Sequence, residues 1–327
     1  MNLPDLPMKY AISVGLTMAA AAGLTACGSG AGSTTASPLA SRSSSAPAPA
    51  SGSAPVLDRT AGDRMDGVAE QRRASRVRGL YGELFSPSGG SAQLATLAEP
   101  AARVHGSPSG ARDIATHFAK LRQEVPGARA VIKHLASDGN LVAVHWQLTT
   151  RPEREDTGEA WGDLYRFDGD RIAELWTTRQ KVPATTASGH SLFSDVYRYP
   201  GGTAPTLTES QEDSHRVMAS TAYARLQAGE SAVLDQYWDN GYRQHNPAAK
   251  DGLAAVKELF AAPAPASTTP GAGSGSASAD PSSAQLATLG DGDLVWVFTE
   301  LGSPDSVLLD IFRVSAGRIT EHWDVAS

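Results

Sequence analysis

Apolar residues recur at helical spacing in the first part of each half of the chain, at 64–84, 114–121 and 215–228. Runs that alternate every two residues and are rich in β-branched and aromatic residues follow in both halves. These predicted strands span 131–135, 141–148, 163–167 and 172–176, then 294–301, 307–314 and 319–325. Helices followed by antiparallel strands predict an α+β domain in which a curved sheet wraps over helices.

The two halves match each other residue by residue. Asp163–Arg166 and Asp170–Trp176 correspond to Asp310–Arg313 and Gly317–Trp323, and every pair is 147 residues apart. Upstream, 141–144 corresponds to 294–297 at a spacing of 153, because a hairpin loop is six residues longer in the first copy. Spacings that are constant within elements and change at loops indicate a duplicated domain. The peptide Ser-Ala-Gln-Leu-Ala-Thr-Leu occurs at both 91–97 and 283–289, out of register with this duplication, and we interpret it as coincidence.

The N-terminus has the pattern of an export signal. Lys9 precedes an uncharged stretch, 10–26, which is too short and weakly apolar to span a bilayer. Its end, Leu24–Cys27, resembles the lipobox of bacterial lipoproteins, in which the cysteine is acylated. We therefore expect 1–26 to be a cleaved signal peptide, with Met8 as an alternative start, and Cys27 to carry lipid such as palmitate. The chain would then be lipid-anchored at the extracytoplasmic face of the cell membrane; the alternative is an ordinary secretory signal.

Composition divides the mature chain further. Residues 27–57 are nearly all Gly, Ser, Ala, Thr and Pro, which predicts a disordered tether. The first domain is then expected at 58–183, a linker at 184–212, and the second domain at 213–327 with a low-complexity loop at 261–283. Cys27 is the only cysteine, so no internal disulfide is expected.

Charge and motifs exclude several classes of function. The net charge of −7 argues against nucleic acid as a partner. The eight histidines lack the paired spacing of a zinc site, and there is no Walker loop, no dinucleotide-binding glycine turn and no Gly-x-Ser-x-Gly elbow. We therefore expect neither a metal nor a cofactor.

The second copy resembles the SnoaL-like branch of the NTF2-like superfamily, which includes polyketide cyclases. The resemblance extends over nearly all of this copy apart from the low-complexity loop. The motifs that carry it are Tyr242–Pro247, Asp251–Gly252, Gly290–Val295, Asp310–Arg313, Gly317–Ile319 and Glu321–Asp324. It implies two tandem cone-shaped domains, a small-molecule pocket under each sheet and frequent dimerisation through the sheet, here as an internal pseudo-dimer.

The resemblance also implies cofactor-free acid–base chemistry on a carbonyl compound. Asp310 is the expected base, because its strand neighbours are apolar and an apolar setting raises a carboxyl pKa. His245 is the expected second catalytic residue. The residues expected to contact a ligand are Tyr242, Gln244, Asn246, His322 and Trp323, with His145 and Asp163 in the first copy.

The first copy departs from this pattern. It has Val104–Pro108 in place of the Gln-His-Asn-Pro stretch, and Leu175 and Thr177 in place of His322 and Asp324. Structural interpretations stand beside the functional ones: the terminal-strand tryptophans fit core packing, and His322 and Asp324 share a strand face and could pair with each other. Two functions therefore remain open, a cofactor-free enzyme and a non-catalytic ligand-binding or scaffold lipoprotein at the cell surface.

Overall fold

The computed structural model describes residues 67–86, 89–261 and 283–326. The first domain contains α1 (Gly67–Leu84), α2 (Ser91–Leu97), β1 (Ala98–His105), α3 (Ile114–Glu124), β2 (Arg129–Asp138), β3 (Leu141–Thr149), β4 (Glu159–Asp168) and β5 (Arg171–Lys181). The second contains α4 (Glu209–Gln227), α5 (Val233–Tyr237), β6 (Trp238–Gln244), α6 (Leu253–Ala261), β7 (Ser283–Asp291), β8 (Leu294–Ser303), β9 (Ser306–Ser315) and β10 (Arg318–Val325).

The two domains have the same topology. Their five-stranded sheets run β1-β5-β4-β3-β2 and β6-β10-β9-β8-β7. In each, the first strand pairs parallel with the last and the other pairs are antiparallel. The predicted α+β class and the tandem arrangement of two cone-shaped domains are thus confirmed.

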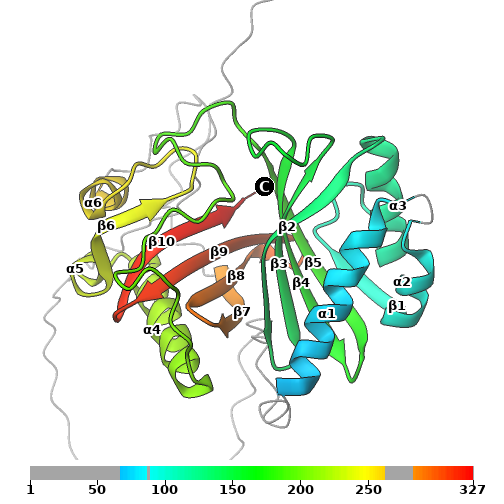
Figure 1. Cartoon of the computed structure of the whole chain (residues 1–327), viewed down its shortest axis with the longest axis horizontal. Coiled ribbons are helices and arrows are strands. Elements are labelled where there is room, and N and C mark those ends of the chain that lie inside the picture. The colour runs from blue at the N-terminus through cyan, green and yellow to red at the C-terminus, as the bar shows by residue number, and fades with distance from the viewer. Residues whose placement is uncertain (1–66, 87–88, 262–282, 327) are drawn as a thin grey trace, which may run out of the picture.

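Each domain has its own core on the concave side of its sheet. In the first, Tyr81 and Leu84 of α1 pack against Trp146 and Trp161 of the sheet. In the second, Tyr223 of α4 belongs to the same cluster as Phe312 and other concave residues. The helices therefore close the two cones on opposite sides of the molecule, with the two sheets between them (Figure 1).

The outer faces of the two sheets pack on each other. One hydrophobic cluster joins Leu164 and Trp176 of the first sheet to Leu309 and Trp323 of the second. At Gly162 the sheets come so close that an added Cβ would lie 2.6 Å from Cδ2 of Leu309. Strand alternation explains both cores, because successive side chains point to opposite faces.

Several predictions fall outside the described residues: the signal peptide, Cys27, the tether at 27–57 and nearly all of the loop at 261–283. The lipid anchor therefore stays a prediction. Within 67–86, 89–261 and 283–326, no helix is both long and apolar enough to cross a membrane.

Candidate functional site

The concave face of the second sheet carries a buried carboxylate–imidazole pair. Asp310 of β9 and His322 of β10 are 2% and 7% exposed, and Oδ1 of Asp310 lies 2.9 Å from Nε2 of His322. His322 therefore pairs with Asp310 by a hydrogen bond, whereas the sequence had suggested its strand neighbour Asp324. The pair sits beside Phe312, whose ring stacks on the imidazole with centroids 4.8 Å apart.

Gln244 of β6 fixes the orientation of this imidazole. Its Oε1 accepts a hydrogen bond from the backbone N–H of Asn246 at 2.9 Å, and its Nε2 donates to the hydroxyl oxygen of Tyr242 at 3.2 Å. Oε1 must then also be the acceptor for Nδ1 of His322, which lies 3.0 Å away. Because Nδ1 carries a hydrogen, the remaining nitrogen, Nε2, shares a proton with the Asp310 carboxylate.

Asp324 supplies a second carboxyl group at the same place. It is the direct cross-strand neighbour of Asp310, and one oxygen accepts a hydrogen bond from the side-chain amide of Asn246. Its Oδ1 is buried and has no hydrogen-bond partner among the described residues. Burial raises the pKa of Asp324, and the nearby Asp310 carboxylate adds to this, although His322 opposes it. A carboxyl group of this kind can accept and return a proton.

Two tyrosines complete the polar lining. Tyr223 of α4 lies against Asp310, and burial and this carboxylate raise the pKa of the phenol well above its ordinary value. Burial likewise raises the pKa of Tyr242. Both phenols therefore stay protonated near neutral pH, and that of Tyr242 can donate a hydrogen bond to a developing negative charge.

The first domain places an equivalent aspartate in a closed setting. Asp163 accepts hydrogen bonds from Thr177 Oγ1 at 2.5 Å, from Trp146 Nε1 at 2.8 Å and from the Tyr81 hydroxyl. Burial raises its pKa to about 6, against the lowering effect of these donors. Three donors occupy both carboxylate oxygens, so this aspartate is held as part of the core.

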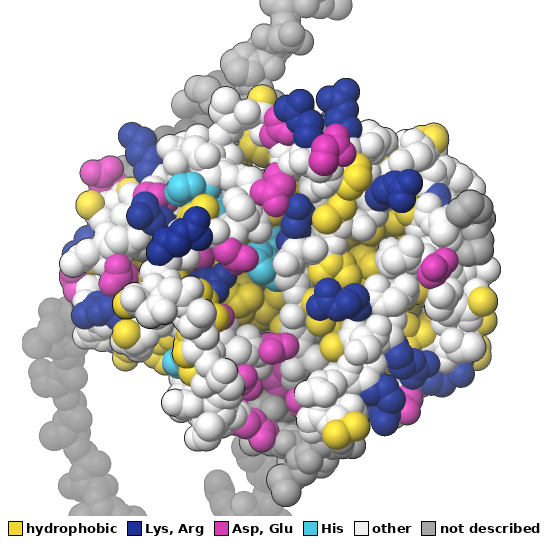
Figure 2. Space-filling view, viewed as in Figure 1, with side chains coloured by type: hydrophobic (Ala, Val, Ile, Leu, Met, Phe, Trp, Pro, Cys, Tyr) yellow, Lys and Arg dark blue, Asp and Glu magenta, His cyan; other side chains and the backbone are white. Residues whose placement is uncertain are grey.

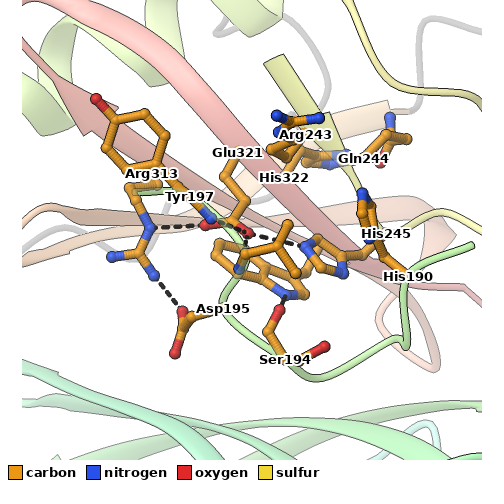
Figure 3. A network of polar contacts seen from close by, with 12 residues as sticks. His190, Ser194, Asp195, Tyr197, Arg243, Gln244, His245, Arg313, Glu321 and His322 are labelled. Atoms are coloured by element: carbon orange, nitrogen blue, oxygen red, sulfur yellow. Dashed lines mark hydrogen bonds and ion pairs between the residues drawn. The ribbon is translucent and has the colours of Figure 1, made fainter. Parts of the chain in front are cut away.

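His245 lies on the other side of the second sheet. Its Nδ1 donates to the carbonyl of Ser191 at 2.5 Å, its Nε2 is 3.0 Å from Oε1 of Glu321, and its ring stacks on Trp323. Figure 3 shows this network, in which Glu321 also bonds Arg313. We had expected His245 and Trp323 to lie beside Asp310, but the structure places both on the opposite face of the sheet.

His145 also points away from its cone. It is fully buried, its Nδ1 lies 3.0 Å from Nδ1 of His134, and its ring packs near Phe193 of the segment between the domains. Burial, with the neighbouring His134, holds the pKa of His145 well below its ordinary value. Histidine side chains reach the surface between the two halves of the molecule (Figure 2).

The described part of the chain holds no group of three or more His, Cys, Asp or Glu side chains placed to bind a metal ion.

Residues 83–175 match the family model of the SnoaL-like domain. The chain contains a SnoaL-like domain. This match lies in the first domain, although the motifs quoted from the sequence are more complete in the second. The comparison with curated proteins gives no match.

Among solved structures, SnoaL-like and related proteins are similar to about one third of the chain. IdmH from Streptomyces antibioticus, a candidate polyketide cyclase, is 21% identical over 33% of this chain and 92% of its own, with a TM-score of 0.27. A candidate isomerase of the SnoaL-like family from Agrobacterium tumefaciens is 17% identical over 34% and 96%, with a TM-score of 0.29. Bal32a from a soil-derived mobile gene cassette is 18% identical over 35% and 93%, with a TM-score of 0.30.

The site of the second domain thus differs in part from the set expected for a SnoaL-like protein. The structure gathers Tyr242, Gln244, Asn246, Asp310 and His322 on one concave face. Sequence reasoning gave no site role to Asp324, Tyr223 or Glu321. A signal for Glu321 was present, because a glutamate stands two residues before a tryptophan in the last strand of both copies, as Glu174 and as Glu321.

Proposed function

We propose that the second domain binds a small carbonyl compound and moves a proton at the carbon next to the carbonyl group, without a cofactor. The observation that carries this proposal is the Asp310–His322 pair, 2.9 Å apart and adjacent to Asp324, whose pKa burial raises. A SnoaL-like domain supports small-molecule binding. The concave face adds the acid–base groups that such a fold needs for chemistry.

Each polar group has a separate role in this proposal. Asp324 takes the proton through its unpartnered Oδ1, and the electron pair of the broken C–H bond moves to the carbonyl oxygen as an enolate. Tyr242 donates a hydrogen bond to that oxygen. His322, held by Gln244 and Asp310, stabilises the negative charge of the Asp324 carboxylate before it takes the proton. Asp324 then returns the proton to carbon or oxygen.

Deuterium exchange tests this chemistry without knowledge of the natural substrate. We expect the protein to accelerate exchange at the carbons next to the carbonyl of 2-tetralone in D₂O, followed by proton NMR. Asp324→Asn and Asp310→Asn should each slow this exchange about a hundredfold, the scale of general acid–base catalysis. Asp163→Asn, the same change in the first domain, should leave it unaltered. Equal exchange in wild type and Asp324→Asn would refute the role of Asp324.

A non-catalytic ligand-binding or scaffold role is the second candidate. It is favoured by the small exposure of the site, since Asp310 and His322 are almost entirely covered. Saturable binding of 2-tetralone with no exchange above the buffer rate would support this role against the enzyme.

The two domains in this proposal form an internal pseudo-dimer at a membrane. Gly162 and Leu309 are equivalent positions, 147 residues apart, and they contact each other across the two sheets. Contact between equivalent residues is what an approximate twofold axis requires. The anchor is the lipid expected on Cys27, and release of a Cys27→Ser variant into the soluble fraction would test it.

A further inference from the structure

The outer faces of both sheets carry the same four side chains in the same arrangement. In the second domain these are Arg313, Glu321, His245 and Trp323, which we call the second clasp. In the first domain they are Arg166, Glu174, His105 and Trp176, the first clasp. The arginine donates to the glutamate at 2.9 Å and 2.7 Å respectively. The histidine stacks on the tryptophan with centroids 4.9 Å apart in both.

The second clasp holds an extended segment of the chain, residues 190–199, which we call the strap. The Asp195 carboxylate bonds Arg313, and the backbone N–H groups of Val196 and Tyr197 donate to Oε1 of Glu321 at 2.7 and 3.2 Å (Figure 3). The other two clasp residues bind strap carbonyls. His245 donates to Ser191 at 2.5 Å, and Trp323 Nε1 donates to Ser194 at 3.3 Å.

The first clasp has the same groups but no strap among the described residues. The side chains of Arg166, Glu174 and His105 are 30%, 23% and 17% exposed. Those of Arg313, Glu321 and His245 are 8%, 0% and 0% exposed. The histidine–glutamate distance is 3.5 Å in the first clasp and 3.0 Å in the second, and His105 Nε2 has no hydrogen-bond partner among the described residues.

The two clasps also differ in the number of carboxylates that pair with the arginine. Arg313 forms ion pairs with Asp195, Asp293 and Glu321. Arg166 has one carboxylate partner in the described part of the chain, Glu174, at 2.6 Å. The position equivalent to Asp293 is Asn140, 153 residues earlier, and its buried Oδ1 has no hydrogen-bond partner in the described residues. The first clasp can therefore take a further carboxylate.

One end of the first clasp is already bound to a carboxylate from the other domain. Asp305, in the turn between β8 and β9, accepts a hydrogen bond from the backbone N–H of Gly106 at 3.4 Å and lies 3.8 Å from Nδ1 of His105. This is the nitrogen that in His245 binds the strap carbonyl. A hollow of about 310 Å³ adjoins it, lined in part by Gly106, Thr178 and Asp305. An acceptor group is thus accommodated at this end, with space beside it.

We propose that the first clasp binds an extended peptide segment of a partner protein that carries an aspartate or glutamate, in the way the second clasp binds the strap. The peptide carboxylate pairs with Arg166, whose planar guanidinium favours such a partner. The backbone N–H groups that follow donate to Glu174. The site is on the outer face of the sheet, so it is independent of the acid–base site inside the second cone.

The strap itself provides the probe. We expect a labelled synthetic peptide with the sequence of residues 190–200 to bind the full chain saturably, as measured by fluorescence anisotropy. Asp195→Asn in the peptide, and Arg166→Met or Glu174→Gln in the protein, should each weaken binding about tenfold or more. Arg72→Met removes a half-exposed arginine that pairs with Asp170 and should leave the affinity unchanged. Melting curves establish that the variants remain folded.

Three results would overturn the proposal. The first is no binding to the wild-type protein at millimolar peptide. The second is binding that Arg166→Met and Glu174→Gln leave unaltered, because the peptide would then occupy another site, such as the second clasp in place of the strap. The third is concentration-dependent dimerisation that Arg166→Met abolishes, which would identify a second copy of this chain as the occupant.

Discussion

The interiors of the two cones share a tyrosine–aspartate pair but differ in the side chains that the first and last strands place around it. In both, a tyrosine of the first long helix lies against an aspartate of the fourth strand, Tyr81 with Asp163 and Tyr223 with Asp310. Strand pairing aligns the first-domain residues Val104, Leu175 and Thr177 with Gln244, His322 and Asp324. Replacing two apolar side chains and a hydroxyl in this way adds an imidazole and a second carboxyl group beside the shared aspartate.

The two clasps on the outer faces show the opposite relation: their four side chains are the same, but the strap covers only the second clasp. Glu321 illustrates what covering does: burial opposes its ionisation, yet hydrogen bonds from His245 and the Val196 backbone, with the charge of Arg313, hold its pKa below the ordinary value. A residue's identity in a duplicated fold therefore does not fix its role. Its neighbours decide whether it is part of a core, a site or a surface.

The largest effect is expected from removing the same arginine in each domain. Arg313→Met leaves the buried Glu321 without its arginine partner, which costs about 3 to 5 kcal/mol of the free energy of unfolding. Arg166→Met acts on a partly exposed pair and should cost about 1 kcal/mol or less. Urea denaturation followed by tryptophan fluorescence measures both. Similar costs for the two variants would show that the strap adds nothing to the second clasp.

Strand alternation carried most of what the sequence could predict. It gave the strands of both sheets apart from β1, β6 and β7, and it placed Asp310 on the concave face. The same alternation argues against placing both Gln244 and His245 in one site. Gln244 and His245 are consecutive at the end of β6, so they point to opposite faces and cannot both line one pocket.

Other features depend on contacts far apart in the chain. The peptide Ser-Ala-Gln-Leu-Ala-Thr-Leu forms helix α2 at 91–97 and part of strand β7 from Ser283. Local propensity is the same in both places, so packing decides the outcome. The strap is similar: its hydrogen bonds join Asp195 to Arg313 across more than a hundred residues, and no local pattern predicts them.

A pH-dependent difference is expected from the aspartate of the first cone. Its folded pKa of about 6 lies above the ordinary value of 3.8, so the folded state binds the proton more tightly. The stabilisation is complete below about pH 4 and is lost as the pH rises through 6. At about 1.4 kcal/mol per pH unit, the loss is roughly 3 kcal/mol. Asp163→Asn removes this pH-dependent contribution to the free energy of unfolding.

We therefore expect the stability of wild type, relative to Asp163→Asn, to fall by this amount between pH 4 and pH 6.5. Asparagine can still accept from Tyr81 and Trp146, and Thr177 can turn its hydroxyl to accept from the amide. Urea midpoints across this range measure the difference. Asp113→Asn provides a control of opposite sign, because a hydrogen bond from the Thr116 backbone lowers the pKa of Asp113. If the difference in stability between wild type and Asp163→Asn does not change with pH, the Asp163 carboxyl has the same pKa in the folded and unfolded states.

The smallest effect is expected where the two domains touch. Gly162→Ala adds a methyl group 2.6 Å from Cδ2 and 3.1 Å from Cβ of Leu309. The leucine tip can turn away but its Cβ is fixed by β9, so overpacking should cost about 1 to 2 kcal/mol. Leu309→Val shortens the opposing side chain and should recover part of this loss in the double variant. If instead the effects of the two substitutions on thermal unfolding are additive, Gly162 and Leu309 do not contact each other in solution. The approximate twofold axis that relates the two domains would then pass elsewhere.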